Sequence, residues 1–254
     1  MPPKPFPTHF LCVPIVTPSS RPQLALSLEA FAVDVTNPAS FGVPREAIRP
    51  VGTLHLTLGV FAFPRDKDEG LKKATQLLKS LKVKDLLPTP VPPAPIVQAG
   101  EKPTATGPPT LTLRGLASMQ SVHKTSVLYA PPVDPDGTLQ AFCERVRRIF
   151  QEAGLLVEDT RPLLLHATIL NTVYAKGVER SEGVGQPRKS FHRRRERLTI
   201  DAQGILERYE DQVWLENFKV TKIAICKMGA NKIVVDGVED EVYEVVAETD
   251  IYAT

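Results

Sequence analysis

Two short stretches of this chain share one pattern: LHLTL at residues 54–58 and LHATI at residues 165–169. Each stretch places a histidine and a threonine two positions apart within an otherwise apolar run. Because side chains i and i+2 of a β-strand point to the same face, each histidine is expected to share a face with its threonine. The apolar residues then occupy the opposite face. The pattern therefore predicts two strands, each presenting a base beside a hydroxyl group.

The four polar residues of these stretches, His55, Thr57, His166 and Thr168, suit the chemistry of a phosphodiester. Cleavage needs a base, an acid and donors that hold the phosphoryl oxygens. An unperturbed histidine pKa of about 6.5 allows one copy to be neutral and the other protonated near neutral pH. A single His-x-Thr strand is more often structural, but two copies in a chain with five histidines favour catalysis or phosphate binding. The sequence offers no obvious cluster of metal-ligating carboxylates around them, so no metal or other cofactor is expected.

The surroundings of the two motifs are also related. Arg49-Pro50 precedes the first motif and Arg161-Pro162 precedes the second at nearly the same distance. This similarity predicts an internal duplication, with one motif strand in each half of the molecule.

Apolar periodicity and turn residues predict an α+β chain. Strands are expected at residues 9–16, 49–63, 110–119, 126–131, 163–173, 218–227 and 241–249. Helices are expected at residues 22–35, 66–81, 136–154 and 203–211. Residues 1–8 are predicted to be a flexible arm, and residues 9–254 a single domain. Eight prolines mark residues 88–109 as a surface insertion, and residues 175–197 are predicted to form a basic loop.

Composition limits the remaining possibilities. A hydrophobic fraction of 42% is enough for a core, and a net charge of +2 gives no global basic field that would indicate nucleic acid binding. Cys12, Cys143 and Cys226 are too few and scattered for a disulfide framework or a zinc site, so buried free thiols are expected. No signal peptide or membrane span is evident, which favours a reducing compartment, the cytosol or the nucleus.

Further residues are candidates for contacts with substrate. Asn171 and Tyr174 follow the second motif and could line a cleft, where the tyrosine could stack on a base. Phe10 lies on the first predicted strand. Its side chain is expected either in the core or beside the bound nucleotide. A run of basic residues contains Arg193, Arg194 and Arg195. These arginines could bind phosphates; the alternative is that they belong to a solvated loop.

The chain resembles the 2H phosphoesterase superfamily, which is named for two H-x-[ST] motifs and related in fold to 2′-5′ RNA ligases. The resemblance is closest to the branch of the A-kinase anchoring protein 7 and activating signal cointegrator complex subunit 1 domains. It is carried by HFLCVPI at 9–15, TLHLTLGV at 53–60 and HATILNT at 166–172, and it covers residues 8–250. It implies a bilobal, pseudo-twofold α+β fold, with two mostly antiparallel sheets flanked by helices around a central cleft.

The resemblance also implies roles. His55 and His166 would be the acid/base pair, and Thr57 and Thr168 would hold the phosphate, without a metal. Which histidine is the base stays open. Substrates would be RNA ends, 2′,3′-cyclic phosphates or 2′-5′-linked oligonucleotides, cleaved by a monomer. The alternative is a non-catalytic subunit that binds a nucleotide or RNA within a transcription-coactivator or repair assembly. A 2′-5′ ligase is a third possibility, and it ranks last because hydrolysis is favoured in dilute water.

Overall fold

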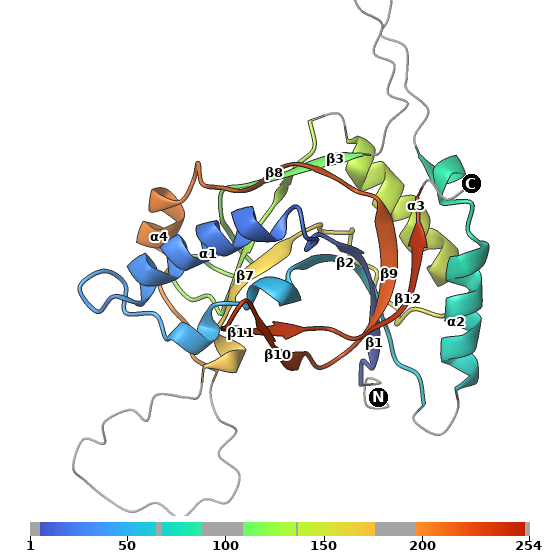
Figure 1. The fold of residues 1–254 in the computed structure, drawn as a ribbon, viewed down its shortest axis with the longest axis horizontal. Coiled ribbons are helices and arrows are strands. Elements are labelled where there is room, and N and C mark those ends of the chain that lie inside the picture. The colour runs from blue at the N-terminus through green and yellow to red at the C-terminus, as the bar shows by residue number, and fades with distance from the viewer. Residues whose placement is uncertain (1–5, 65–67, 88–108, 136, 176–196, 252–254) are drawn as a thin grey trace, which may run out of the picture.

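The computed structural model describes residues 6–64, 68–87, 109–135, 137–175 and 197–251 (Figure 1). The strands are β1 (His9–Pro14), β2 (His55–Phe61), β3 (Thr110–Arg114), β4 (Ala117–Ser118), β5 (Val127–Ala130), β6 (Pro132–Val133), β7 (Ala167–Asn171), β8 (Val213–Lys219), β9 (Lys222–Lys227), β10 (Asn231–Val235), β11 (Val238–Val242) and β12 (Val245–Asp250). The α-helices are α1 (Arg21–Thr36), α2 (Glu69–Ser80), α3 (Thr138–Glu152) and α4 (Gln203–Arg208). Short 3-10 turns are η1 (Arg45–Ala47), η2 (Val51–Thr53), η3 (Val83–Leu86) and η4 (Thr172–Tyr174).

All strand pairs in the described residues are antiparallel. The strands form one four-stranded sheet in the order β12-β9-β1-β2 and two three-stranded sheets, β6-β3-β8 and β4-β5-β7. Strands β10 and β11 form a separate hairpin. The predicted α+β class with mostly antiparallel strands is confirmed, although the described strands form four sheets, counting the hairpin, instead of two.

The two motif strands occupy equivalent places. Strand β2 lies at the edge of the four-stranded sheet and β7 at the edge of the β4-β5-β7 sheet, and the two strands contact each other. The segment before β2 also pairs with β7, through a bridge between Ile48 and Leu170 and a 2.9 Å hydrogen bond from the Arg49 amide to the Ile169 carbonyl. The segment at residues 48–49 therefore links the start of the first motif directly to the second motif strand.

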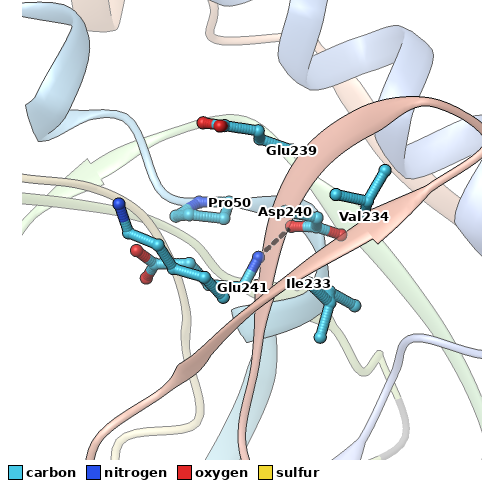
Figure 2. Close-up of a pocket in the computed structure, with 7 residues that line it drawn as sticks. Pro50, Ile233, Val234, Glu239, Asp240 and Glu241 are labelled. Atoms are coloured by element: carbon cyan, nitrogen blue, oxygen red, sulfur yellow. Dashed lines mark hydrogen bonds between the residues drawn. The ribbon is translucent and has the colours of Figure 1, made fainter.

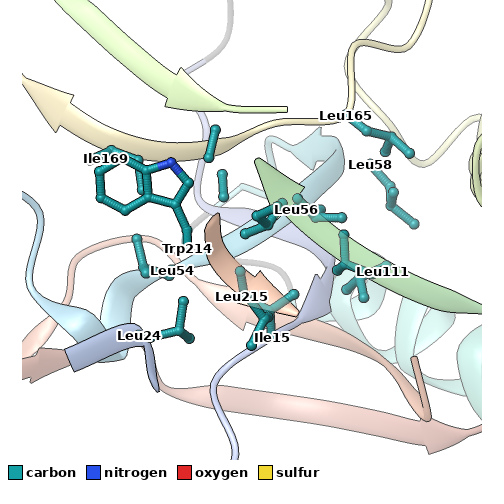
Figure 3. Close-up of a cluster of buried hydrophobic side chains, with 14 of the residues drawn as sticks. Ile15, Leu24, Leu54, Leu56, Leu58, Leu111, Leu165, Ile169, Trp214 and Leu215 are labelled. Atoms are coloured by element: carbon teal, nitrogen blue, oxygen red, sulfur yellow. The ribbon is translucent and has the colours of Figure 1, made fainter. Parts of the chain in front are cut away.

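The apolar faces of the motif strands lie in the core, as their alternation predicts. Leu54, Leu56 and Leu58 are at most 3% exposed, and the apolar residues of the second motif, Leu165 and Ile169, are buried beside them (Figure 3). Trp214 of β8 is fully buried in the same cluster, and its indole N–H donates to the Gly115 carbonyl at 2.8 Å. Both histidines and both threonines of the motifs are only partly buried, on the opposite faces.

The helices cover the sheets with their apolar sides. Helix α1 contacts β8 and buries a row of five residues at near-helical spacing: Leu24, Leu28, Phe31, Ala32 and Val35. Helix α3 contacts β2, and α2 contacts β12 (Figure 1). The predicted limits of α3 are confirmed, because Gly137 and Gly154 flank it with positive φ values of 67° and 65°.

Several predicted strands are wrong in extent. The strand expected at 49–63 begins only at His55, because Pro50 has no amide hydrogen for a ladder and residues 51–53 form η2. The strand expected at 163–173 is reduced to β7, and His166 immediately precedes it. The strand expected at 218–227 is two strands, since the chain leaves the sheet of β8 and enters the sheet of β9.

The hairpin β10–β11 was not predicted. Its turn is formed by Asp236 and Gly237, which have φ values of 52° and 79°. Positive φ at both central residues is typical of the type I′ turn that Asp-Gly favours between two strands. The insertion at 88–109 lies outside the described residues apart from residue 109, as does the loop at 175–197 apart from its two ends.

We predict that Leu56→Ala destabilises the protein by about 2–5 kcal/mol, because it leaves a cavity under the first motif. The matched control is Leu26→Ala on α1, where the leucine is 75% exposed and the loss should stay within about 0.5 kcal/mol. Urea unfolding of both variants measures the difference. Equal losses would contradict the assigned orientation of β2.

Candidate active site

The two motif histidines are held in the same way. The Nδ1 atom of His55 lies 2.8 Å from the Thr53 carbonyl oxygen, and Nδ1 of His166 lies 2.8 Å from the Leu164 carbonyl oxygen. A carbonyl only accepts, so Nδ1 must carry the hydrogen in both rings. The remaining nitrogen, Nε2, is then free to exchange a proton with a ligand. Each motif thus fixes the tautomer of its histidine through the backbone two residues earlier.

His55 is the more enclosed of the two. Its ring stacks on Phe10 at 4.5 Å between centroids and meets the edge of Tyr243 at 5.4 Å. Burial lowers its pKa from the ordinary 6.5 to about 4, against the opposing effect of the hydrogen bond to Thr53. The positive charges of His166 and Arg49 lower the pKa of His55 further. His55 is therefore neutral at neutral pH.

His166 stands in a more open position. Its ring lies 5.4 Å from that of Tyr129 on the neighbouring strand β5, in an edge-on arrangement. His166 immediately precedes β7, the strand that contacts β2 with His55 at its start. Each histidine is thus packed against an aromatic ring, and among the described residues its Nε2 has no hydrogen-bond partner.

The two motif hydroxyls are available as donors. Thr57 lies opposite Cys12 in the ladder, and Thr168 lies opposite Tyr129. Among the described residues, neither threonine hydroxyl has a hydrogen-bond partner. Each is two residues beyond its histidine and partly exposed on the same face, as the sequence predicts.

A small pocket of about 80 Å³ lies at the junction of the motif strands. It is lined by Arg49, Thr53, His55, Thr168, Asn171, Tyr174 and Tyr243. The structure therefore brings residues of both motifs to one hollow. Thr57 and His166 do not line this pocket, although they lie on the same strand faces as the residues that do.

The secondary candidates differ in their placement. Asn171 and Tyr174 line the pocket; the Asn171 side-chain oxygen accepts from the Val173 amide at 3.1 Å and caps η4. Phe10 is only 2% exposed and stacks on His55 without lining the pocket, so of the two expected places it takes the core position. Arg193, Arg194 and Arg195 lie outside the described residues. Of the same basic run, Arg197 reaches the Ser126 hydroxyl at 3.5 Å.

Sequence analysis missed three lining residues. Arg49 was noticed only as part of a duplicated Arg-Pro pair, and Thr53 only as a residue preceding the motif. Tyr243 follows the unpredicted hairpin, and the Asp-Gly pair at 236–237 was the signal that could have revealed it.

A second, larger hollow lies beside the hairpin and has a volume of about 410 Å³ (Figure 2). It is lined by Pro50, Lys232, Ile233, Val234, Glu239, Asp240 and Glu241. None of the motif residues lines it, and it combines carboxylates and a lysine without a histidine or a free nucleophile. The smaller pocket is the better candidate because both motifs supply its walls.

Asp240 of the hairpin braces the turn before His55. Its carboxylate accepts from the Gly52 amide at 3.1 Å and pairs with the Arg21 guanidinium at 2.6 Å. The hairpin backbone approaches so closely that a Cβ on Gly52 would lie 2.4 Å from the Glu241 carbonyl oxygen. The hairpin thus fixes η2, which supplies the carbonyl that orients His55.

Among the described residues, no group of three or more histidine, cysteine or acidic side chains is arranged to hold a metal ion. The three cysteines are buried and free, as expected. No helix in the described ranges is long and apolar enough to cross a membrane.

Comparison with known proteins agrees with this architecture. Residues 7–251 match the profile described as the AKAP7 2′-5′ RNA ligase-like domain. An uncharacterized protein of Schizosaccharomyces pombe is 32% identical over 122 residues, which are 48% of this chain and 50% of that protein; the alignment thus spans about half the length of this relative. The chain belongs to the family of AKAP7 2′-5′ RNA ligase-like domains.

Solved structures show the same fold. LigT of E. coli, crystallised with 3′-AMP, has a TM-score of 0.51 and 15% identity, with coverage of 97% of this chain and 99% of that one. A structure described as a phosphoesterase has a TM-score of 0.48 and 17% identity, with coverage of 97% and 98%. The predicted resemblance to the A-kinase anchoring protein 7 branch is confirmed by the family match over residues 7–251.

We predict that the imidazole of His55 titrates with a midpoint near pH 4, because burial disfavours its charged form. Proton NMR of the histidine ring signals measures this, and the signal is assigned by its loss in His55→Gln. A midpoint at or above the ordinary 6.5 would contradict the enclosure of this ring.

We predict that Asp240→Ala destabilises the protein by about 2–4 kcal/mol, since it leaves the Gly52 amide and the Arg21 guanidinium without their partner. The control is Glu239→Ala, which removes an exposed carboxylate from the same strand. Urea unfolding measures both variants. Similar stabilities of the two would show that the hairpin does not brace η2.

Proposed function

We propose that this protein is a metal-independent phosphodiesterase that cleaves RNA ends carrying a 2′,3′-cyclic phosphate, or 2′-5′-linked oligonucleotides. The observation that carries the proposal is the matched pair of histidines, each with Nδ1 held by a carbonyl and Nε2 free. Two hydroxyls without protein partners accompany them on the same strand faces. Such groups meet the three requirements of phosphodiester cleavage: a base, an acid and donors to the phosphoryl oxygens.

In the proposed reaction, His55 is the base, because it is neutral at neutral pH. Its Nε2 takes a proton from water while the water oxygen attacks phosphorus. His166 acts in its imidazolium form, and its Nε2–H protonates the ribose oxygen as the phosphorus–oxygen bond breaks. Thr57 and Thr168 donate to the non-bridging oxygens. The ring-opened product is a phosphate monoester. His55 then returns its proton to solvent, and His166 takes up a proton from solvent, which restores both histidines.

The substrate class is supported by the family and by the size of the pocket. E. coli LigT was crystallised with 3′-AMP, a ribonucleotide monoester. A hollow of about 80 Å³ is far smaller than the 300–1,000 Å³ of sites that enclose a whole ligand. It suits one phosphate group, while the nucleoside stays outside, where the half-exposed ring of Tyr174 is available for stacking.

We predict that His55→Ala and His166→Ala each lower kcat/KM by about 10²–10⁴-fold on a 2′,3′-cyclic nucleotide, because each removes one proton-transfer group. The assay contains EDTA, and 2′-5′ oligoadenylate is tested in parallel. The matched control is His123→Ala, which removes an exposed histidine paired with Asp201 and should leave turnover unchanged.

Two results would contradict the enzyme. Binding without turnover across this panel would instead support a nucleotide- or RNA-binding subunit of a larger assembly. Turnover that requires an added metal ion would overturn the proposed acid/base mechanism. Joining of 2′-5′ ends in concentrated oligonucleotide would show that the same groups also act in the ligation direction.

A further inference from the structure

Arg49 is a buried arginine that makes no ion pair among the described residues. It is 7% exposed, and its amide is tied to the Ile169 carbonyl of β7. Its guanidinium carbon lies 3.8 Å from the centre of the Tyr174 ring, and Tyr243 lines the same pocket. The face of Tyr174 thus covers one side of the guanidinium.

Several other arginines form ion pairs with carboxylates; Arg21 pairs with Asp240, and Arg208 pairs with Asp34. Arg49 has no such pair among the described residues, and no acidic side chain lines the pocket that it enters. A buried charge without a counter-charge is costly, and the face of a tyrosine offsets only part of that cost. The site is therefore electrostatically incomplete without an anion.

The rest of the pocket is suited to the same ligand. The Thr168 hydroxyl is unpaired among the described residues, and the Asn171 amide uses its oxygen to accept from Val173, which leaves its NH₂ group as a donor. Donors from three residues, Arg49, Thr168 and Asn171, thus border a hollow of about 80 Å³. This set of donors fits a single phosphate group.

We propose that Arg49 binds the phosphoryl group of the substrate directly, as a permanent cation that acts together with the proposed His166 imidazolium. Its planar guanidinium can donate to two non-bridging oxygens at once and carries a positive charge. Each threonine hydroxyl is neutral and donates a single hydrogen bond. In a reaction without a metal ion, this arginine supplies the positive charge that stabilises the negative charge developing on those oxygens. The identity of the substrate rests on the function proposed above, whereas the phosphate contact of Arg49 stands on the pocket itself.

The test is the affinity for inorganic phosphate, measured by calorimetry on the full chain. Arg49→Gln should weaken phosphate binding about 10- to 100-fold, because a charged hydrogen-bonding partner is lost. Arg49→Lys keeps the positive charge but loses the two-pronged guanidinium. Its affinity for phosphate should therefore lie between that of the unmodified protein and that of Arg49→Gln. The matched control is Arg147→Gln: Arg147 is 9% exposed on α3 and donates to the Asp159 carbonyl, and its replacement should leave phosphate affinity unchanged.

Thermal unfolding verifies that each variant is folded. Where Arg49→Gln does not fold, the Nε–H signal of Arg49 in the unmodified protein is followed by NMR during phosphate titration. A shift that saturates with the calorimetric affinity supports the proposal, and an unmoved signal overturns it. A folded Arg49→Gln protein that binds phosphate within twofold of the unmodified chain also overturns it.

These outcomes separate this inference from the proposed function. Phosphate binding that depends on Arg49, in a protein that turns over no substrate, supports the contact and contradicts the enzyme. Turnover that needs both histidines but is unchanged in Arg49→Gln supports the enzyme and contradicts the contact.

Discussion

The geometry of the candidate site depends on the pairing of the chain segment at residues 48–49 with strand β7. The bridge from Ile48 to Leu170 and the hydrogen bond from Arg49 to Ile169 fasten the approach to the first motif onto the second motif strand. Both motif strands lie at sheet edges, so without this link nothing in the ladders would fix their separation. The same link places Arg49 beside residues of both motifs.

The two halves of the site are alike in backbone and different in environment. Each histidine donates from Nδ1 to the carbonyl two residues earlier. His55, however, is enclosed by Phe10 and Tyr243, whereas His166 stands in the open beside Tyr129. Burial lowers the pKa of His55, and the role of base proposed for this copy rests on its neutral form.

The parts of the fold that depend on local periodicity could be predicted from the sequence, because alternating apolar residues require a buried face. The paired His-x-Thr strands are of this kind, and the helical spacing of apolar residues predicts the buried side of α3 in the same way. The contacts that complete the site are not local. Tyr243 arrives on a hairpin whose Asp-Gly turn was overlooked, and Arg49 becomes a lining residue only when its segment pairs with β7. The periodicity of apolar residues does not predict such contacts, because they depend on which segments the folded chain brings together.

The central claim is that both histidines act on one phosphorus atom. A crystal structure of the protein with a ribonucleoside–vanadate complex, a stable mimic of the five-coordinate phosphorus, tests it most directly. The account predicts Nε2 of His55 and Nε2 of His166 on opposite sides of the vanadium, each within hydrogen-bonding distance of an apical oxygen. Vanadate bound in the hollow beside the hairpin, or in contact with only one of the two imidazoles, would contradict it.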